Sequence, residues 1–311
     1  MVDLEIDIGA IVGELRELRE SAMAVRRRED QPVKLPSRKV LASVVDGLSA
    51  ALFPQRLGPR ELNRASVDFF VGQALDRALH DLQNQVQRET AAQDDTFRES
   101  VNAETVAAGA ASLAAEIVAN FSRLLPGIRR ALEADVQAIF DGENAARSVD
   151  EVLGCYPTVR AIVHYRFAHV LDRLGAPLVA RMIADIAHST TGIEIHPQAI
   201  IGRSFAIHHG TGVVIGRTAV IGDRVRLFHG VTLGAAPSTG KLSTNGFEPS
   251  SCPKLEDDVT IYSGATILGS IVIGRGSVIG GNVWLTESVA PGSFVTQAHV
   301  LGIEYRDGSG I

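Results

Sequence analysis

Hydrophobic positions in the second half of the chain recur every six residues. They are Ile195, Ile201, Ile207, Ile215, Ile221, Leu227, Leu233, Leu255, Ile261, Ile267, Ile273, Ile279 and Leu285, with a two-residue slip after Ile207 and a loop after Leu233. A period of six predicts a parallel β-helix, in which three repeats complete one triangular coil and the aliphatic side chains stack inside it. Ordinary β-hairpins, the alternative, alternate with a period of two. Glycine often follows the aliphatic residue, and we expect it at corners where positive φ is favourable.

The first half of the chain has apolar residues three and four positions apart, which predicts helices. We expect them at 4–29, 38–53, 60–92, 102–140 and 158–189, with breaks at Pro126-Gly127 and Gly175-Ala-Pro177. The predicted architecture is an all-α domain at 1–190 and a left-handed parallel β-helix of hexapeptide repeats at 191–292. The β-helix carries a loop at 235–254, and a tail follows at 293–311.

Composition excludes several classes of protein. The 311 residues carry a formal net charge of −6, which gives no basic field for nucleic acid. No apolar run is long enough to cross a membrane, and Asp3, Glu5 and Asp7 stand where a signal peptide would be positive. We expect a cytoplasmic protein. Its two cysteines, Cys155 and Cys252, are too few for a disulfide framework.

Histidines mark the candidate chemistry on the coil. His209 is two residues after Ile207, and His229 is two residues after Leu227. One coil separates these positions, so the two imidazoles are expected to be neighbours about 4.8 Å apart. A single histidine on a polar face is more often a surface residue, whereas two stacked histidines between glycines favour a site.

Several segments, in their order along the chain, resemble serine O-acetyltransferases, a family of hexapeptide-repeat acyltransferases. They are Gly192-Ile-Glu-Ile-His-Pro197, His209-Gly-Thr-Gly212, Gly230-Val-Thr-Leu-Gly234, Pro253-Lys254 and Ile261-Tyr-Ser-Gly-Ala-Thr-Ile-Leu-Gly269. Upstream, Asp141-Gly-Glu-Asn-Ala-Ala146, Tyr156-Pro157 and Tyr165-Arg-Phe-Ala-His169 are similar to the helical part of that family. The resemblance covers roughly 130–311. It implies transfer of acetyl from acetyl-CoA, as co-substrate, to the hydroxyl of L-serine for cysteine biosynthesis, without a metal.

The resemblance also implies catalytic roles. His209 matches the base that removes the hydroxyl proton, and Glu194 matches the carboxylate that orients its ring, where the family usually has aspartate. Backbone N–H groups near Gly230 and Gly234 are expected to stabilise the oxyanion.

The implied acceptor pocket departs from the family. Its residues are Glu143, His208, His229, Ser251 and Cys252. Glu143 and His208 stand where two aspartates usually hold the serine ammonium group. Ser251 and Cys252 stand where an Arg-His pair contacts the carboxylate and hydroxyl. Loss of the arginine forfeits about 1.5–3 kcal/mol, unless Lys241, Lys254 or an arginine of the helical domain replaces it.

By the same resemblance, coenzyme A lies between adjacent subunits of a trimer or a dimer of trimers. The implied coenzyme contacts are Gly234, Ala235, Ser263, Gly264, Gly281 and Lys254, with a channel free of Cβ atoms at Gly280-Gly281.

The chain ends in a polar, glycine-rich tail and Ile311. In the family such a tail enters the active site of O-acetylserine sulfhydrylase, so that enzyme is the expected partner. Three alternatives remain: an acetyltransferase for another hydroxylated acceptor, a non-catalytic scaffold for the sulfhydrylase, and a zinc lyase of γ-carbonic anhydrase type. The last would draw its ligands from His196, His208, His209 and His229.

Overall fold

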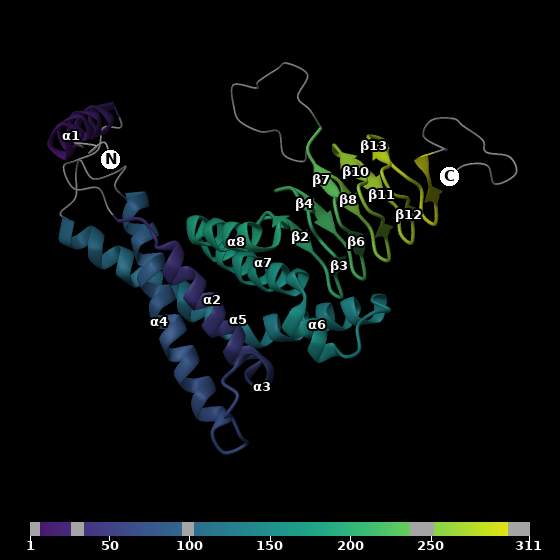
Figure 1. Ribbon diagram of the computed structural model, residues 1–311, viewed down its shortest axis with the longest axis horizontal. Helices are drawn as coiled ribbons and strands as arrows, with labels where there is room; N and C mark the ends of the chain where they lie inside the picture. The colour runs from purple at the N-terminus through teal and green to yellow at the C-terminus, as the bar shows by residue number, and fades with distance from the viewer. Residues whose placement is uncertain (1–6, 26–33, 95–102, 237–251, 298–311) are drawn as a thin grey trace, which may run out of the picture.

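The computed structural model describes residues 7–25, 34–94, 103–236 and 252–297, and consists of helices followed by short parallel strands (Figure 1). The helices are α1 (Ile8–Val25), α2 (Arg38–Leu52), α3 (Pro54–Leu57), α4 (Val67–Asp94), α5 (Ala103–Gly142), α6 (Val149–Cys155), α7 (Pro157–Leu174) and α8 (Pro177–Thr191). The strands are β1 (Glu194–Ile195), β2 (Ile200–Ile201), β3 (Ala206–His208), β4 (Val214–Ile215), β5 (Val220–Ile221), β6 (Arg226–Phe228), β7 (Thr232–Gly234), β8 (Lys254–Leu255), β9 (Thr260–Ile261), β10 (Thr266–Leu268), β11 (Val272–Ile273), β12 (Val278–Ile279), β13 (Trp284–Leu285) and β14 (Phe294–Val295). Within these ranges, no helix is both long and apolar enough to cross a bilayer.

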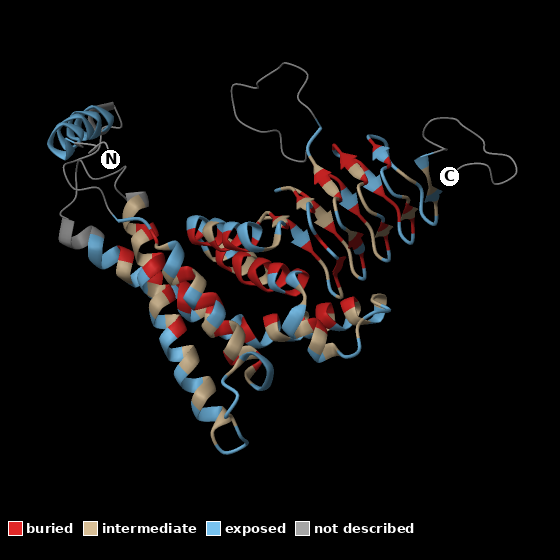
Figure 2. Ribbon diagram, viewed as in Figure 1, coloured by how far each residue is buried: buried red, intermediate tan, exposed pale blue. Residues whose placement is uncertain are grey.

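The helical core forms where α2, α4, α5, α7 and α8 pack together, and Figure 2 shows its buried residues in red. Leu41 and Leu48 of α2 and Leu82 of α4 are at most 1% exposed. Phe121 of α5 meets Phe167 of α7 edge to face, with ring centroids 6.1 Å apart. These apolar faces explain why the three-and-four spacing forms a bundle.

Two helix predictions need correction. α4 begins at Val67 rather than at residue 60, because the side chain of Asn63 accepts two backbone N–H bonds and holds a turn there. Pro126 does not interrupt α5, which is buried on both sides of that residue and runs on to Gly142. In contrast, Gly175 adopts a left-handed φ of 101° and divides α7 from α8, as its position beside Pro177 suggests.

The strands form the left-handed β-helix that the six-residue period predicts. Sheet 1 has the order β1-β4-β7-β10-β13, sheet 2 the order β2-β5-β8-β11, and sheet 3 the order β3-β6-β9-β12-β14, all with parallel pairing. Every aliphatic residue at the predicted spacing is at most 8% exposed. The inward stack is therefore a continuous apolar core along the coil.

The glycines that follow the inward residues have a different cause from the one predicted. Gly202, Gly222 and Gly274 do not have positive φ. A Cβ atom at these positions would lie 2.7, 2.8 and 2.4 Å from backbone atoms of the next coil, so only glycine fits. Left-handed backbone occurs instead three residues after the aliphatic position, for example at Gly264 and Asn282.

The slip in the period is a local bulge. His208 still pairs with Phe228 between β3 and β6. Pairing resumes at Thr211, whose carbonyl oxygen accepts from the N–H of Gly230 at 2.9 Å. The segment His209-Gly210 is therefore the two-residue insertion, and its φ angles of 60° and 84° turn the chain outward.

A buried ion pair joins the helices to the first coil. The guanidinium of Arg166 in α7 donates to both carboxylate oxygens of Asp135 in α5, at 2.9 and 3.0 Å. Arg166 also donates to the carbonyl oxygens of Ile201 and Gly202, and Asp135 accepts from the N–H of Phe205 at 2.9 Å. The start of β3, and with it the bulge, is thus tied to the helical part.

Candidate active site

The side chains of His209 and His229 meet at the corner between sheets 3 and 1, here called the histidine corner. Their ring centroids are 5.8 Å apart and their planes make an angle of 64°. Both side chains are exposed. The structure confirms that the two imidazoles are neighbours. However, the residue aligned with His229 is Thr211, so the contact depends on the bulge rather than on regular stacking.

A ladder of rings lies next to the histidine corner. His208 points outward from the coil but is only 3% exposed, because the end of α5 covers it. Its ring stacks on Phe228 at 5.0 Å, and Phe228 stacks on Tyr262 at 4.8 Å. Sequence reasoning missed Phe228 and Tyr262, although both directly follow an inward aliphatic residue, one coil apart.

Glu143 and His208, the two residues expected to hold the ammonium group, lie together. The Oε2 atom of Glu143 is 3.8 Å from Nδ1 of His208. Burial lowers the pKa of His208, an effect that Glu143 opposes and Arg226 reinforces. At neutral pH the imidazole is therefore uncharged, and the Glu143 carboxylate is not neutralised by it.

Glu194 does not contact His209 in this structure. Its carboxylate lies 3.5 Å from Nη2 of Arg181 in α8, and no hydrogen bond links it to His209 within the described residues. Glu194 is the outward residue of β1, which packs against α8. Its predicted role as the orienting carboxylate requires the side chain to turn from the arginine to the imidazole.

A cavity of about 300 Å³ lies beside Glu194. It is lined by Asp172, Pro177, Arg181, His196, Pro197, Gln198 and Arg217. Nε of Arg217 donates to Oε1 of Gln198 at 2.6 Å. Burial, followed by the two arginines, lowers the pKa of His196. The two guanidinium groups belong to no recognisable motif, so sequence reasoning missed this cationic cavity.

Cys252 occupies a different corner, between sheets 1 and 2. Its backbone N–H donates to Oγ1 of Thr218 at 3.1 Å, and the residue is 8% exposed. Within one chain it is therefore not placed beside His209. Lys254 is exposed at the start of β8 in sheet 2. Ser251, Lys241 and Ile311 lie outside the described residues.

The expected coenzyme residues divide into two groups on either side of sheet 1. Ser263, Gly264 and Gly281 lie on the histidine corner, whereas Gly234 is the last residue of the sheet 1 strand β7 and Ala235 follows it at the opposite corner. One chain thus presents two separate halves of the predicted coenzyme surface.

Two backbone expectations change in detail. The N–H of Gly230 donates to the Thr211 carbonyl at 2.9 Å, so it is not available to an oxyanion as predicted. The expected channel at Gly280-Gly281 is narrowed by the chain itself. A Cβ atom there would lie 3.1 Å from the Val295 carbonyl oxygen or 3.2 Å from that of Ser263.

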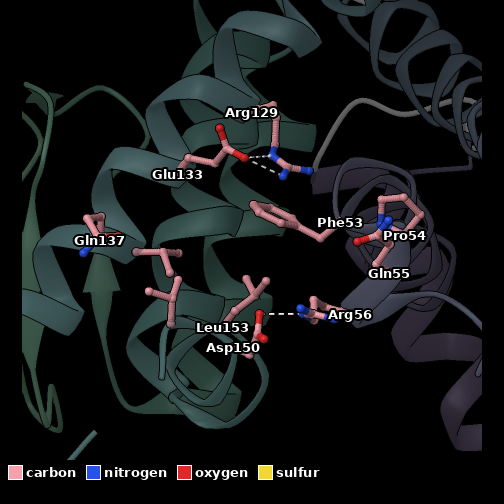
Figure 3. Close-up of a pocket in the computed structure, with 11 residues that line it drawn as sticks. Phe53, Pro54, Gln55, Arg56, Arg129, Glu133, Gln137, Asp150 and Leu153 are labelled. Atoms are coloured by element: carbon pink, nitrogen blue, oxygen red, sulfur yellow. Dashed lines mark hydrogen bonds and ion pairs between the residues drawn. The ribbon is translucent and has the colours of Figure 1, made fainter. Parts of the chain in front are cut away.

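A second cavity, of about 570 Å³, lies among α3, α5 and α6 (Figure 3). Its two arginines are neutralised, Arg129 by Glu133 and Arg56 by Asp150. It contains no histidine. Among the described residues, no three His, Cys, Asp or Glu side chains are grouped so as to hold a metal ion. The histidine corner is therefore the candidate active site.

Several known proteins are similar to this chain. Residues 253–287 match the family model of the bacterial transferase hexapeptide (six repeats). Over 308 residues the chain is 44% identical to a plasmid serine acetyltransferase of Synechococcus elongatus, covering 98% of this chain and 95% of that protein. It is 48% identical over 149 residues to a serine acetyltransferase of Bacillus licheniformis, covering 48% and 65%. The crystal structure of serine acetyltransferase isoform 3 from Entamoeba histolytica, in complex with cysteine, is 28% identical with a TM-score of 0.69, covering 91% of this chain and 87% of that one.

Proposed function

The chain belongs to the serine acetyltransferase family, and from this premise we propose that it transfers acetyl from acetyl-CoA to the hydroxyl of L-serine, giving O-acetylserine for cysteine biosynthesis. The observation that carries the proposal is the exposed pair His209 and His229 on the bulge of the coil. The contact supports a reactive imidazole held at the edge of the coil.

His209 acts as the base. Its neutral imidazole accepts the proton of the serine hydroxyl while the hydroxyl oxygen attacks the carbonyl carbon of the acetyl thioester. The C–S bond then breaks, and the imidazolium returns the proton to the thiolate of coenzyme A. Glu194 turns from Arg181 to the imidazole and stabilises the imidazolium.

Glu143 binds the ammonium group of the acceptor. Its carboxylate stands beside the buried, uncharged His208. The negative charge of Glu143 is therefore available to pair with the positive charge of the acceptor's ammonium group. His229 packs against the acceptor from the neighbouring coil. Protonation of His208 at low pH creates a competing cation and weakens serine binding.

Arg181 takes the role of the missing arginine for the acceptor carboxylate. It belongs to the helical part and already pairs with Glu194. When Glu194 turns toward His209, the guanidinium becomes free to bind a carboxylate. We expect Arg181→Ala to raise KM for L-serine about tenfold or more, as loss of a charge-assisted hydrogen bond of about 1.5–3 kcal/mol implies. The matched control is Arg203→Ala, on an exposed part of the coil. Equal KM values in the two variants would exclude Arg181.

The activity is tested by following thiol release from acetyl-CoA with L-serine, L-homoserine or L-threonine. We expect release with L-serine and its loss in His209→Ala, with the fold monitored by circular dichroism. Release only with another acceptor would identify a different substrate. No release with any acceptor would favour the scaffold alternative, and stoichiometric zinc in the purified protein would favour the lyase.

We further propose that the site is completed by a neighbouring subunit in a trimer or a dimer of trimers. Gly234 and Cys252 lie across sheet 1 from the histidine corner, which supports completion by a second copy. Light scattering gives the mass of the assembly and so distinguishes a trimer from a dimer of trimers.

The tail is proposed to bind O-acetylserine sulfhydrylase through Ile311, so deletion of that residue should abolish binding. The proposed location is the cytoplasm, which fractionation of cells tests.

A further inference from the structure

Helix α1 has an apolar stripe without a partner. Ile8, Ile11, Leu15 and Leu18 are 68%, 48%, 48% and 64% exposed. The helix lies apart from the other helices in Figure 1, and its residues 8–22 are exposed in Figure 2. Burial of such apolar side chains stabilises an interface, so a continuous exposed stripe indicates an interaction surface.

The stripe follows the heptad pattern of a coiled coil. Its positions alternate at spacings of three and four along the helix: Ile8, Ile11, Leu15, Leu18 and Ala22. With Ile8 at position a, Leu15 and Ala22 are also a residues, while Ile11 and Leu18 are d residues. Gly9 and Gly13 fall at b and f, away from the stripe. Each has a lower helix propensity than alanine, and a helix of this length is marginal in isolation, so α1 depends on a partner for stability.

The charges beside the stripe specify the partner. Glu14 occupies a g position and Arg19 the following e position. In a parallel coiled coil, a g residue faces the e residue five positions further along the partner helix. Glu14 of one helix then faces Arg19 of an identical helix. An antiparallel pair would place g against g and e against e, and would lose this match.

We propose that α1 forms a parallel coiled coil with the α1 helix of another copy of this chain. Copies related by a rotation axis that runs along α1 present their α1 helices in parallel, as the charges require. The proposal goes beyond the acetyl transfer proposed above and does not rest on it. A membrane surface fits less well, because α1 carries three acidic residues (Glu14, Glu17 and Glu20) against Arg16 and Arg19, whereas interfacial helices are rich in Lys and Arg.

The helix has 18 residues, which is about two and a half heptads. Such a short coil associates weakly by itself, and the contacts between copies in the assembly proposed above would raise its effective concentration. The test therefore uses the full chain. Cys155 is exposed and Cys252 is buried, so Cys155→Ser gives a suitable background.

In that background, Leu18→Cys places a thiol on the stripe and Glu20→Cys places one at f. Under mild oxidation we expect interchain disulfides with Leu18→Cys and several-fold fewer with Glu20→Cys. Equal yields from the two variants, or disulfides with neither, would overturn the proposal.

Charge reversal tests the partner. In the Leu18→Cys chain, Glu14→Lys sets like charges against Arg19 and should lower the disulfide yield about two- to fivefold. Adding Arg19→Glu should restore it, whereas the control Glu17→Lys, at c, should have no effect. Failure of the double variant to recover would refute the parallel pairing. The wild-type chain should not bind vesicles of phosphatidylserine and phosphatidylcholine. Binding that α1 deletion abolishes would assign the stripe to a membrane instead.

Discussion

The contact between the helices and the coil depends on one buried ion pair, and Asp135→Ala tests it. Asp135 is 1% exposed and the Arg166 side chain is 12% exposed. Removing one partner of a buried pair leaves the other charge uncompensated and costs about 3–5 kcal/mol. Because 1.4 kcal/mol corresponds to a factor of ten, the unfolding equilibrium should shift by about two to three and a half powers of ten.

The assay is denaturant unfolding followed by circular dichroism, with Asp185→Ala as the matched control. Asp185 pairs with Arg38 at the surface, where side chains are 54% and 48% exposed, so its loss should cost less than about 1 kcal/mol. Replacing both buried partners, as Asp135→Leu with Arg166→Met, should recover most of the lost stability. An equal loss of unfolding free energy in Asp135→Ala and Asp185→Ala would refute this prediction, because the two ion pairs are expected to differ through the burial of the first.

Three further predictions concern the coil, the pH dependence and the acceptor pocket. Gly274→Ala should destabilise the chain more than Gly276→Ala, as measured by thermal unfolding. A Cβ at Gly274 would lie 2.4 Å from a backbone atom, whereas a Cβ at Gly276 would meet no atom within 4 Å. The only cost of Gly276→Ala is the strain of its left-handed φ of 68°, about 1–2 kcal/mol. Burial lowers the pKa of His164 below its ordinary value of 6.5. The neutral, buried form of His164 therefore contributes fully to folding stability above pH 6.5, and this contribution is lost as the pH falls below 6.5. The unfolding free energy should therefore fall from pH 7.5 to pH 5.5, and less steeply in His164→Gln; an equal slope would contradict this. Gly142→Ala should raise KM for L-serine but not for acetyl-CoA in steady-state assays, because its Cβ would lie 2.7 Å from the His208 ring; an unchanged KM would show that this ring is not part of the pocket.

The neighbouring histidines show how far sequence reasoning extends. Counting repeats correctly predicted that His209 and His229 are neighbours. It did not locate the two-residue insertion, which sits at His209-Gly210 and aligns His229 with Thr211 instead. The spacing from Ile207 to Ile215 shows that two residues are inserted between these inward positions, but it does not show which two.

Contacts between distant segments escaped prediction for a different reason. Arg181 lies 13 residues before Glu194, yet it determines where that carboxylate points. Tyr262 joins His208 only through Phe228 and two steps along the coil. Several partners of similar free energy are available to a long polar side chain. Which of them lie within reach depends on the folded backbone, so the sequence alone does not predict the pairing.

By itself, the sequence determined the left-handed β-helix, its inward residues and the helical region before it, because burial of apolar side chains repeats with the period of the backbone. Only the tertiary structure explained why glycine is required at positions 202, 222 and 274: a Cβ atom at Gly202, Gly222 or Gly274 would collide with backbone atoms one coil away. It also decided that Glu194 pairs with Arg181 and that α5 covers His208. These contacts join residues far apart in the chain, and their geometry follows from how the helices and coil pack rather than from any local pattern.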